Sequence, residues 1–205
     1  MIDLYLAGTA NGLRAAVALE ECELPYRAHA VDLAKGEQRT AEFLKLNPAG
    51  LIPVIVDSEG PGGKPFTLSQ SGAILLYAAE KSGRFMPRDP AQRAIALQWV
   101  LQAASDIATS SNAVFVAENL LPEKTAANLE LFKKRLLTAF AACDRRLEAN
   151  EYLAGELSVA DLLLYPNFAV RKPLLDQAGG YPHLQRWGAA MGARPGVARG
   201  MKVLS

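Results

Sequence analysis

The sequence predicts an α+β domain followed by an all-α domain, and three observations support this prediction. Apolar alternations typical of strands and Ala-rich stretches typical of helices follow one another over residues 1–83. Pro87 and Pro90 then interrupt the chain, and the later apolar repeats have helical spacing. At 205 residues the chain is long enough for two small domains. We therefore predict domains at 1–83 and 91–205, joined by a linker at 84–90.

The first domain is predicted to begin with a strand, a helix and a second strand. Residues 2–7 alternate in polarity and form the first strand, which the small residues at 8–12 end. The Ala-rich segment 13–22 then forms a helix, with Asn11 as its expected N-cap. Residues 26–33 alternate again, as expected of a second strand.

A short helix, a β-hairpin and a longer helix complete the first domain. The short helix, at 40–46, leads into a strand that begins after Pro53, because proline cannot donate to a β-ladder. A Gly- and Pro-rich turn joins that strand to another at 66–68, and a helix follows over 69–82. The order βαβαββα, with a parallel beginning and a hairpin end, is typical of a thioredoxin-like domain.

The second domain is predicted to contain helices only. Asp89 as N-cap and Pro90 at the first helical position start the first of them. Four apolar residues at helical spacing are expected to face its core: Leu97, Leu101, Ala104 and Ala108. Further along, Ser158 and Asp161 have the spacing of a capping box at the start of a buried helix.

Composition excludes several classes of function. The net charge of +1 gives no electrostatic footprint for nucleic acid, and no apolar run reaches the roughly 18 residues that span a bilayer. The first residues lack the pattern of a signal peptide.

Cys22 and Cys143 lie far apart without metal-ligand spacing, and we expect both to be small core residues. We therefore expect no metal, no nucleic-acid or membrane partner, and a cytoplasmic location. No nucleophile pattern accompanies His29 or His183.

The segment from residue 47 to residue 77 carries the pattern that bears on function. It begins NPAGLIPVIVD and, after the turn, continues LSQSGAILLY. A proline at a strand entrance, here Pro53, is a position where a cis peptide presents backbone N–H and C=O groups to a ligand. Gln70 and Ser71 open a helix whose first N–H groups lack partners within the helix and attract a carboxylate.

These two runs resemble the glutathione-binding half of cytosolic glutathione transferases, and the resemblance covers nearly the whole chain. It implies that family's architecture, a thioredoxin-like domain followed by a helical domain, with glutathione as co-substrate. By this resemblance Ile52 and Pro53 hold the cysteinyl backbone of glutathione. Gln70 and Ser71 hold its γ-glutamyl end. The bacterial Nu class of the family commonly has Glu in place of Gln70, so charge pairing with the γ-glutamyl ammonium is lost here.

The resemblance also implies contacts at the other end of the tripeptide. It places Gln38 beside the glycine carboxylate of glutathione. A basic residue of the helical domain is expected to reach glutathione as well, and within residues 133–135 we favour Arg135.

The loop after the first strand, Gly-Thr-Ala-Asn-Gly, resembles the Thr-x-Asn pattern of the Nu class and its disulfide-reductase relatives. The resemblance makes Thr9 and Asn11 the donors that stabilise the glutathione thiolate, Thr9 through its hydroxyl or its backbone N–H and Asn11 through its amide. Tyr5 is the alternative donor, because another branch of the family uses a tyrosine hydroxyl. The competing interpretation is that Thr9 is only a turn residue and Asn11 only a helix cap.

The implied function is that of a glutathione-dependent enzyme that conjugates small electrophiles or reduces small disulfides or peroxides. Since the loop has no cysteine, the glutathione thiolate would itself be the nucleophile. The electrophile pocket is expected at residues 7–10 and 105–115. A homodimer is expected from the resemblance alone. The alternative is a regulatory or binding protein that keeps the transferase fold without activity.

Overall fold

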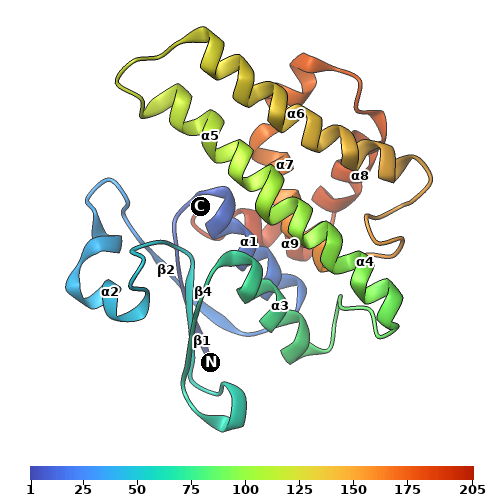
Figure 1. Ribbon diagram of the computed structural model, residues 1–205. Helices are drawn as coiled ribbons and strands as arrows, with labels where there is room; N and C mark the ends of the chain where they lie inside the picture. Colours follow the sequence, from blue (N-terminus) through green and yellow to red (C-terminus); the bar gives the residue numbers. More distant parts are fainter. The chain divides into compact units, whose positions relative to one another are not determined.

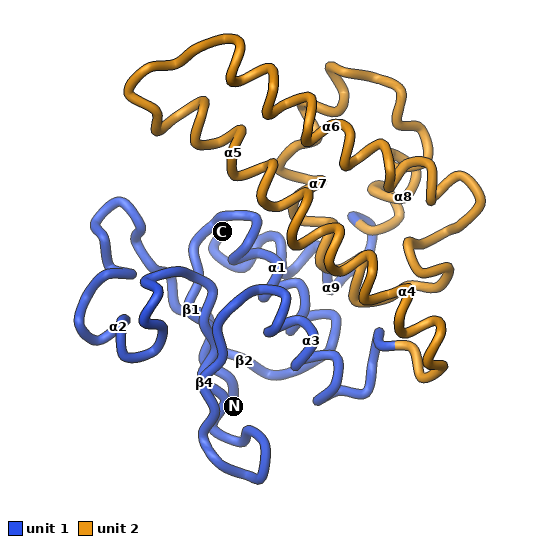
Figure 2. The backbone as a smooth tube through the Cα atoms, in the orientation of Figure 1, with its two compact units in different colours: residues 1–86, 192–205 blue, residues 87–191 orange.

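The computed structural model describes residues 1–205, which group into two units (Figure 2): residues 1–86 with 192–205, and residues 87–191. The first unit is α+β and the second is helical, so the predicted fold class is confirmed. The C-terminal residues group with the first unit because α9 (Pro195–Met201) packs against α1 (Ala10–Glu21). The division into domains at 84–90 stays a prediction.

The first unit is built on a four-stranded sheet in the order β2-β1-β3-β4. Figure 1 labels three of these strands, β1, β2 and β4. β1 runs parallel to β2 and antiparallel to β3, while β3 and β4 form an antiparallel hairpin. The predicted parallel beginning and hairpin end are therefore confirmed. The strands are β1 (Ile2–Leu6), β2 (Tyr26–Ala30), β3 (Val54–Asp57) and β4 (Phe66–Ser69).

Helices complete the first unit, and α1 is the central one because it packs against both α3 and α9. Its close approach to α9 is visible at Gly200, where a Cβ atom would lie 2.6 Å from Cα of Val17. Besides α1 and α9, the helical segments of this unit are η1 (Glu37–Arg39), α2 (Ala41–Leu46), η2 (Pro61–Gly63) and α3 (Ser71–Ser82).

The start of α1 differs from the prediction. Thr9, not Asn11, is the N-cap, and its Oγ1 accepts a hydrogen bond from the N–H of Gly12 at 3.3 Å. Asn11 lies inside the first turn of the helix. The prediction failed because both residues are good N-caps, so the backbone geometry at Thr9 (φ −100°, ψ 159°) had to decide between them.

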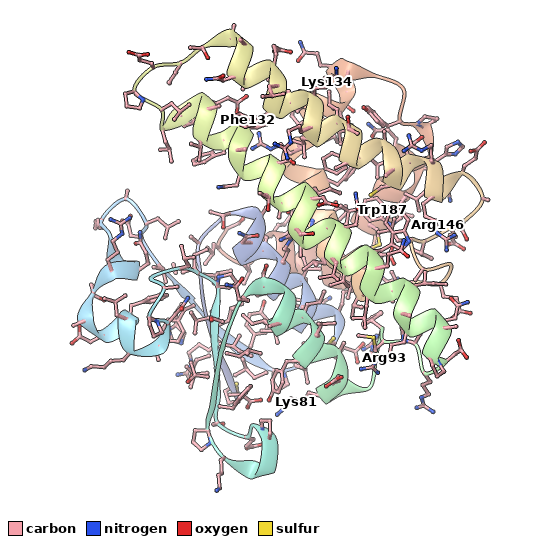
Figure 3. All side chains as sticks on the ribbon, viewed as in Figure 1. Lys81, Arg93, Phe132, Lys134, Arg146 and Trp187 are labelled. Atoms are coloured by element: carbon pink, nitrogen blue, oxygen red, sulfur yellow. The ribbon has the colours of Figure 1, made fainter.

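A buried carboxylate ties β3 to α3. Asp57 is fully buried and accepts hydrogen bonds from the Tyr77 hydroxyl at 2.6 Å and from Nζ of Lys81 at 2.7 Å; Figure 3 labels Lys81. Burial disfavours the charged carboxylate, but the bonds from Lys81 and Tyr77 outweigh this effect and hold the pKa of Asp57 below its ordinary value. This network fixes the direction of α3 relative to the sheet.

The second unit contains α4 (Pro90–Leu101), the π-helical segment η3 (Gln102–Ile107), α5 (Ala108–Asn119), α6 (Ala126–Glu148), α7 (Val159–Ala178) and most of α8 (Pro182–Gly192). Asp89 caps α4 as predicted. The predicted inward stripe is wrong, because Leu101 is 63% exposed. The buried stripe lies one residue earlier, at Ala96, Val100, Ala103 and Ile107. This helix is apolar on two adjacent faces, so spacing alone could not choose between them.

The capping box at the start of α7 is confirmed and organises the interior of the second unit. Asp161 is fully buried, and its Oδ2 accepts hydrogen bonds from the N–H and hydroxyl of Ser158. Its Oδ1 accepts from the N–H of Leu153 and from Nε1 of Trp187, which Figure 3 labels. Burial raises the pKa of Asp161, and these four hydrogen bonds act in the opposite direction.

Two smaller expectations can also be compared with the structure. Cys22 and Cys143 are buried and unpaired with each other, as predicted. None of the helices is both long enough and apolar enough to cross a membrane.

Candidate functional site

The strand register brings three of the predicted segments to one end of the sheet. Tyr5 of β1 pairs with Val54 of β3, and Val54 pairs with Ser69 of β4, so these residues form one row across the sheet. The loop at 7–12 leaves β1 just beyond this row. Ile52 and Pro53 come directly before β3, and Gln70 and Ser71 come directly after β4, where α3 begins. We call the resulting group, Thr9, Asn11, Gln38, Ile52, Pro53, Gln70 and Ser71, the sheet-end site.

Gln38 joins this group through the segment that follows β2. It lies in η1, next to Gly50, where a Cβ atom would be 3.2 Å from the Gln38 carbonyl oxygen and where φ is +62°. Buried Asn47 closes the loop before β3, because its Nδ2 donates to the Leu51 carbonyl at 2.6 Å. The side-chain amide oxygen of Gln38, Oε1, is buried without accepting a hydrogen bond.

The loop reaches β3 through the peptide bond between Ile52 and Pro53, which is cis, as the sequence predicted. Pro53 is buried, and the half-buried Ile52 packs against a cluster made by Val31, Phe43 and Val54. These contacts anchor the loop to the sheet on the side where α2 lies.

The start of α3 is open to a ligand. Gln70 has φ 74° and ψ 116°, a conformation that costs a non-glycine residue about 1–3 kcal/mol and is found mainly at functional sites. Its side chain is exposed and does not cap the helix, so the first backbone N–H groups of α3 have no side-chain partner. Ser71, the first helical residue, is 8% exposed. Such a terminus carries partial positive charge and suits a carboxylate.

Thr9 and Asn11 are both exposed at the start of α1. The backbone N–H of Thr9 donates to the Ala7 carbonyl at 2.7 Å, so of the two Thr9 donors only the hydroxyl hydrogen is left for a ligand. Asn11 Oδ1 accepts a hydrogen bond from Nη1 of Arg14 at 2.9 Å. Sequence reasoning missed Arg14; the available signal was a single basic residue within an Ala-rich, apolar helix.

Tyr5 lies in a different environment from these two residues. It alternates along β1 with fully buried Leu4 and Leu6, and its ring stacks on His29 at a centroid distance of 4.7 Å. The ring edge also contacts Phe43 of α2. Tyr5 therefore packs on the sheet face that bears α2.

The remaining predicted residues belong to the second unit. Arg135 is an exposed residue of α6. Residues 105–115 cover the end of η3 and much of α5, and Phe115 in this segment is 47% exposed. Their role toward a ligand in the first unit stays a prediction.

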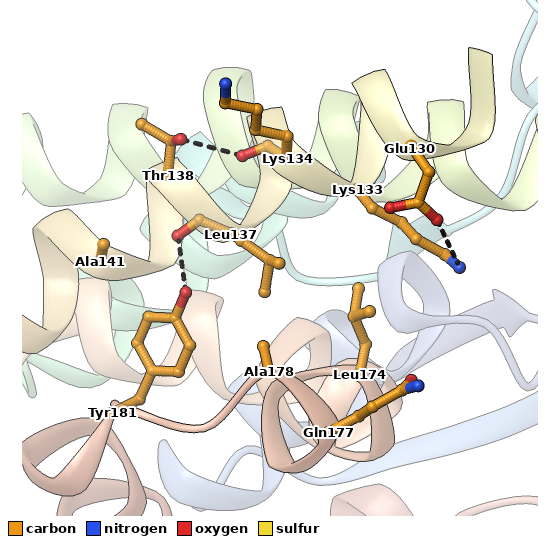
Figure 4. A pocket seen from close by; sticks show the side chains of 10 residues that line it. All are labelled: Glu130, Lys133, Lys134, Leu137, Thr138, Ala141, Leu174, Gln177, Ala178 and Tyr181. Carbon is orange, nitrogen blue, oxygen red and sulfur yellow. Dashed lines mark hydrogen bonds and ion pairs between the residues drawn. The ribbon is translucent and has the colours of Figure 1, made fainter. Parts of the chain in front are cut away.

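The second unit also has a cavity of about 380 Å³ between α6 and α7, shown in Figure 4. Its polar lining includes Lys133, which pairs with Glu130 at 3.5 Å, and Tyr181, whose hydroxyl donates to the Leu137 carbonyl. Lys133 and Lys134, two of the three basic candidates at 133–135, line it, whereas the favoured Arg135 does not. Across the chain, no three His, Cys, Asp or Glu side chains gather as metal ligands would.

Comparison with known proteins gives consistent results. Residues 10–81 match the glutathione S-transferase N-terminal domain, and residues 95–195 match the glutathione S-transferase C-terminal domain. The chain is 36% identical over 204 residues to the disulfide-bond oxidoreductase YfcG of Escherichia coli, covering 98% of this chain and 94% of that protein. It is 32% identical to YghU, another disulfide-bond oxidoreductase of the same organism, covering 97% and 73%.

Solved structures agree with these matches. A glutathione transferase from Burkholderia graminis, with two glutathione molecules bound per subunit, has a TM-score of 0.92 and 33% identity, covering 100% of this chain and 88% of that one. One from Pseudomonas putida, with a glutathione disulfide bound per subunit, has a TM-score of 0.92 and 31% identity, covering 100% and 92%. With both domains matched and both domain folds present, this chain belongs to the glutathione transferase family.

Proposed function

We propose that this protein binds glutathione at the sheet-end site and uses its thiolate to reduce small disulfides or to attack small electrophiles. The observation that carries the proposal is the convergence of an open helix terminus, at Gln70 and Ser71, with two exposed donors, Thr9 and Asn11, at one end of the sheet. The relatives named above, which are disulfide-bond oxidoreductases and glutathione-bound transferases, support it.

The proposed pose follows from the chemistry of the tripeptide. The γ-glutamyl carboxylate lies at the N-terminus of α3, where the Ser71 hydroxyl and the Gln70 amide add donors to the backbone N–H groups. The backbone of Ile52, before Pro53, pairs with the cysteinyl residue. Gln38 donates to the glycine carboxylate, and Arg135 supplies a positive charge from α6.

The thiol of the bound tripeptide then lies at the start of α1. A free thiol has a pKa of about 8.5, so only a few per cent is ionised at neutral pH. Lowering this pKa by about two units requires about 2.7 kcal/mol of preference for the anion. Hydrogen bonds to a charged group contribute about 1.5–3 kcal/mol each, so the Thr9 hydroxyl and the Asn11 amide suffice.

Glutathione supplies the reacting thiolate, since the loop at 7–12 contains no cysteine and both Cys22 and Cys143 are buried. The glutathione thiolate attacks one sulfur of a disulfide, forms a mixed disulfide and releases the other half as a thiolate. A second glutathione thiolate then attacks the glutathione sulfur of that mixed disulfide. The balanced result is one glutathione disulfide and two substrate thiols from two glutathione molecules and one disulfide.

A substrate panel tests the proposal: hydroxyethyl disulfide, a hydroperoxide and a chloro-nitroaromatic compound, each with glutathione. We expect turnover of at least one of these substrates. We expect the fastest turnover with hydroxyethyl disulfide, because the relatives YfcG and YghU are disulfide-bond oxidoreductases. Binding of glutathione is measured separately by calorimetry and by thermal shift at millimolar glutathione. Absence of both binding and turnover would favour the alternative, a regulatory or binding protein with the transferase fold.

Two variants of Gln70 separate its backbone strain from its proposed contact. Because φ at Gln70 is 74°, Gln70→Gly should raise the free energy of unfolding relative to Gln70→Ala by about 1 kcal/mol. Both variants lack the side-chain amide, so both should bind glutathione about tenfold more weakly than the wild type. Urea unfolding and calorimetry measure the two effects. Wild-type affinity in both variants would remove Gln70 from the site.

We further propose a homodimer in the cytoplasm. The two buried, unpaired cysteines are compatible with a reducing compartment. The homodimer is proposed from the family resemblance.

A further inference from the structure

We infer that Arg14 is a positioning residue for the thiolate site: it fixes the Asn11 amide so that its N–H groups, and not its oxygen, face the glutathione sulfur. The inference rests on the proposed function, because it concerns how the glutathione thiolate is stabilised. It adds a residue that the resemblance did not supply.

The geometry determines which end of the Asn11 amide is free. Nη1 of Arg14 lies 2.9 Å from Oδ1 of Asn11. Arginine has donors and no acceptor, so the amide atom that faces it must be the oxygen. The amide nitrogen, with both of its hydrogens, is therefore directed away from Arg14. Because Asn11 is exposed, this nitrogen is accessible to a ligand at the start of α1.

The spacing of the two residues makes this contact direct. Asn11 and Arg14 are three residues apart on α1, and residues at this spacing lie on the same side of a helix. Arg14 is only 2% exposed, so its guanidinium is held by the surrounding protein while Asn11 remains at the surface. A buried group with restricted motion is a better anchor for an exposed amide than a flexible surface side chain.

Burial of the Arg14 charge carries an electrostatic cost. Burial lowers the pKa of Arg14 to about 10, which shows that the surroundings disfavour its charge although it stays protonated at neutral pH. A cation in the N-terminal half of a helix also gains nothing from the helix dipole. The other charged residues of α1, Glu20 and Glu21, lie at its far end and pair with Arg199 and Arg194. The bond from Arg14 to Oδ1 of Asn11 is one of the interactions that hold the guanidinium at this position.

The expected consequence is both orientational and electrostatic. Without Arg14 the Asn11 amide can rotate and present its oxygen, which repels an anionic sulfur. With Arg14 the hydrogen bond to Oδ1 is charge-assisted, and it polarises the amide so that the Nδ2 hydrogens become stronger donors.

The test is a titration of bound glutathione, with the ultraviolet absorbance of the thiolate followed against pH. The proteins are the wild type, Arg14→Met, Arg14→Gln, Arg14→Lys, Asn11→Ala and the double variant Arg14→Met/Asn11→Ala. We expect Arg14→Met to raise the pKa of the bound thiol by about one unit, a tenfold loss of thiolate at a pH below that pKa. Arg14→Lys, which keeps the charge and a donor, should show a smaller shift. In the Asn11→Ala background, Arg14→Met should cause no further shift.

The outcomes separate the inference from the proposed function. If the wild type binds no glutathione, the proposed function and this inference both fail. If glutathione binds and the pKa of its thiol is unchanged in Arg14→Met, only the inference fails. An equal shift with and without Asn11 would show that Arg14 acts independently of it and would also overturn the inference. If Arg14→Met does not fold, Arg14→Gln, which keeps a neutral donor, replaces it, both alone and in combination with Asn11→Ala. The expected shift in the thiol pKa then lies between the shifts for Arg14→Lys and Arg14→Met.

Discussion

Replacing Thr9 and Asn11 together with alanine is expected to lower the glutathione-dependent rate at pH 7 by about 25-fold, because a rise in the thiol pKa from about 6.5 to about 8.5 cuts the thiolate fraction from about three quarters to about 3%. The Thr9 N–H is already bonded to Ala7, so its hydroxyl and the Asn11 amide are the donors at stake. The pKa of the bound thiol should rise toward about 8.5, the value of the free thiol. Rates measured from neutral to alkaline pH should therefore recover as the thiol ionises.

The control must account for the loss of a helix cap. Thr9 caps α1, and removal of such a cap costs about 1 kcal/mol of stability. Thr125 caps α6 in the same way, through a hydrogen bond from the N–H of Asn128. Thr125→Ala should thus lower stability similarly while leaving the pKa of the bound thiol unchanged. If the double variant keeps the wild-type thiol pKa, Tyr5 or backbone groups must stabilise the thiolate instead.

The second large effect concerns stability. Asp161→Ala is expected to lower the free energy of unfolding of the second unit by about 3–5 kcal/mol. The fully buried carboxylate accepts four hydrogen bonds, from the N–H of Leu153, the N–H and hydroxyl of Ser158 and the indole N–H of Trp187, and the variant leaves all four donors without an acceptor. Urea unfolding followed by tryptophan fluorescence measures this change, since the Trp187 indole is one of those donors.

Two further variants define the mechanism of this effect. Asp161→Asn should also be strongly destabilising, because its amide nitrogen would face groups that are themselves donors. Asp176→Ala, which removes an exposed carboxylate of the same helix paired with Lys172, should change stability little. A small effect of Asp161→Ala would mean that water or a rearranged backbone satisfies the four donors.

Sequence alone was sufficient for features that depend on neighbours along the chain. The order of strands and helices, the proline at the entrance to β3, the helix start at Ser71 and the capping box at Ser158 all follow from local patterns. In each of these cases the residue types needed for the structure lie within a few positions of one another. Their preferences therefore point to one conformation before any long-range contact forms.

Tertiary structure decided the features that depend on distant packing. Strand register placed the loop at 7–12, the cis-proline loop and the start of α3 at one end of the sheet. Packing chose which apolar stripe of α4 is buried, brought α9 onto α1, and buried Arg14 beneath Asn11. Burial and register are set by contacts between residues far apart in the chain, so local patterns alone cannot determine them.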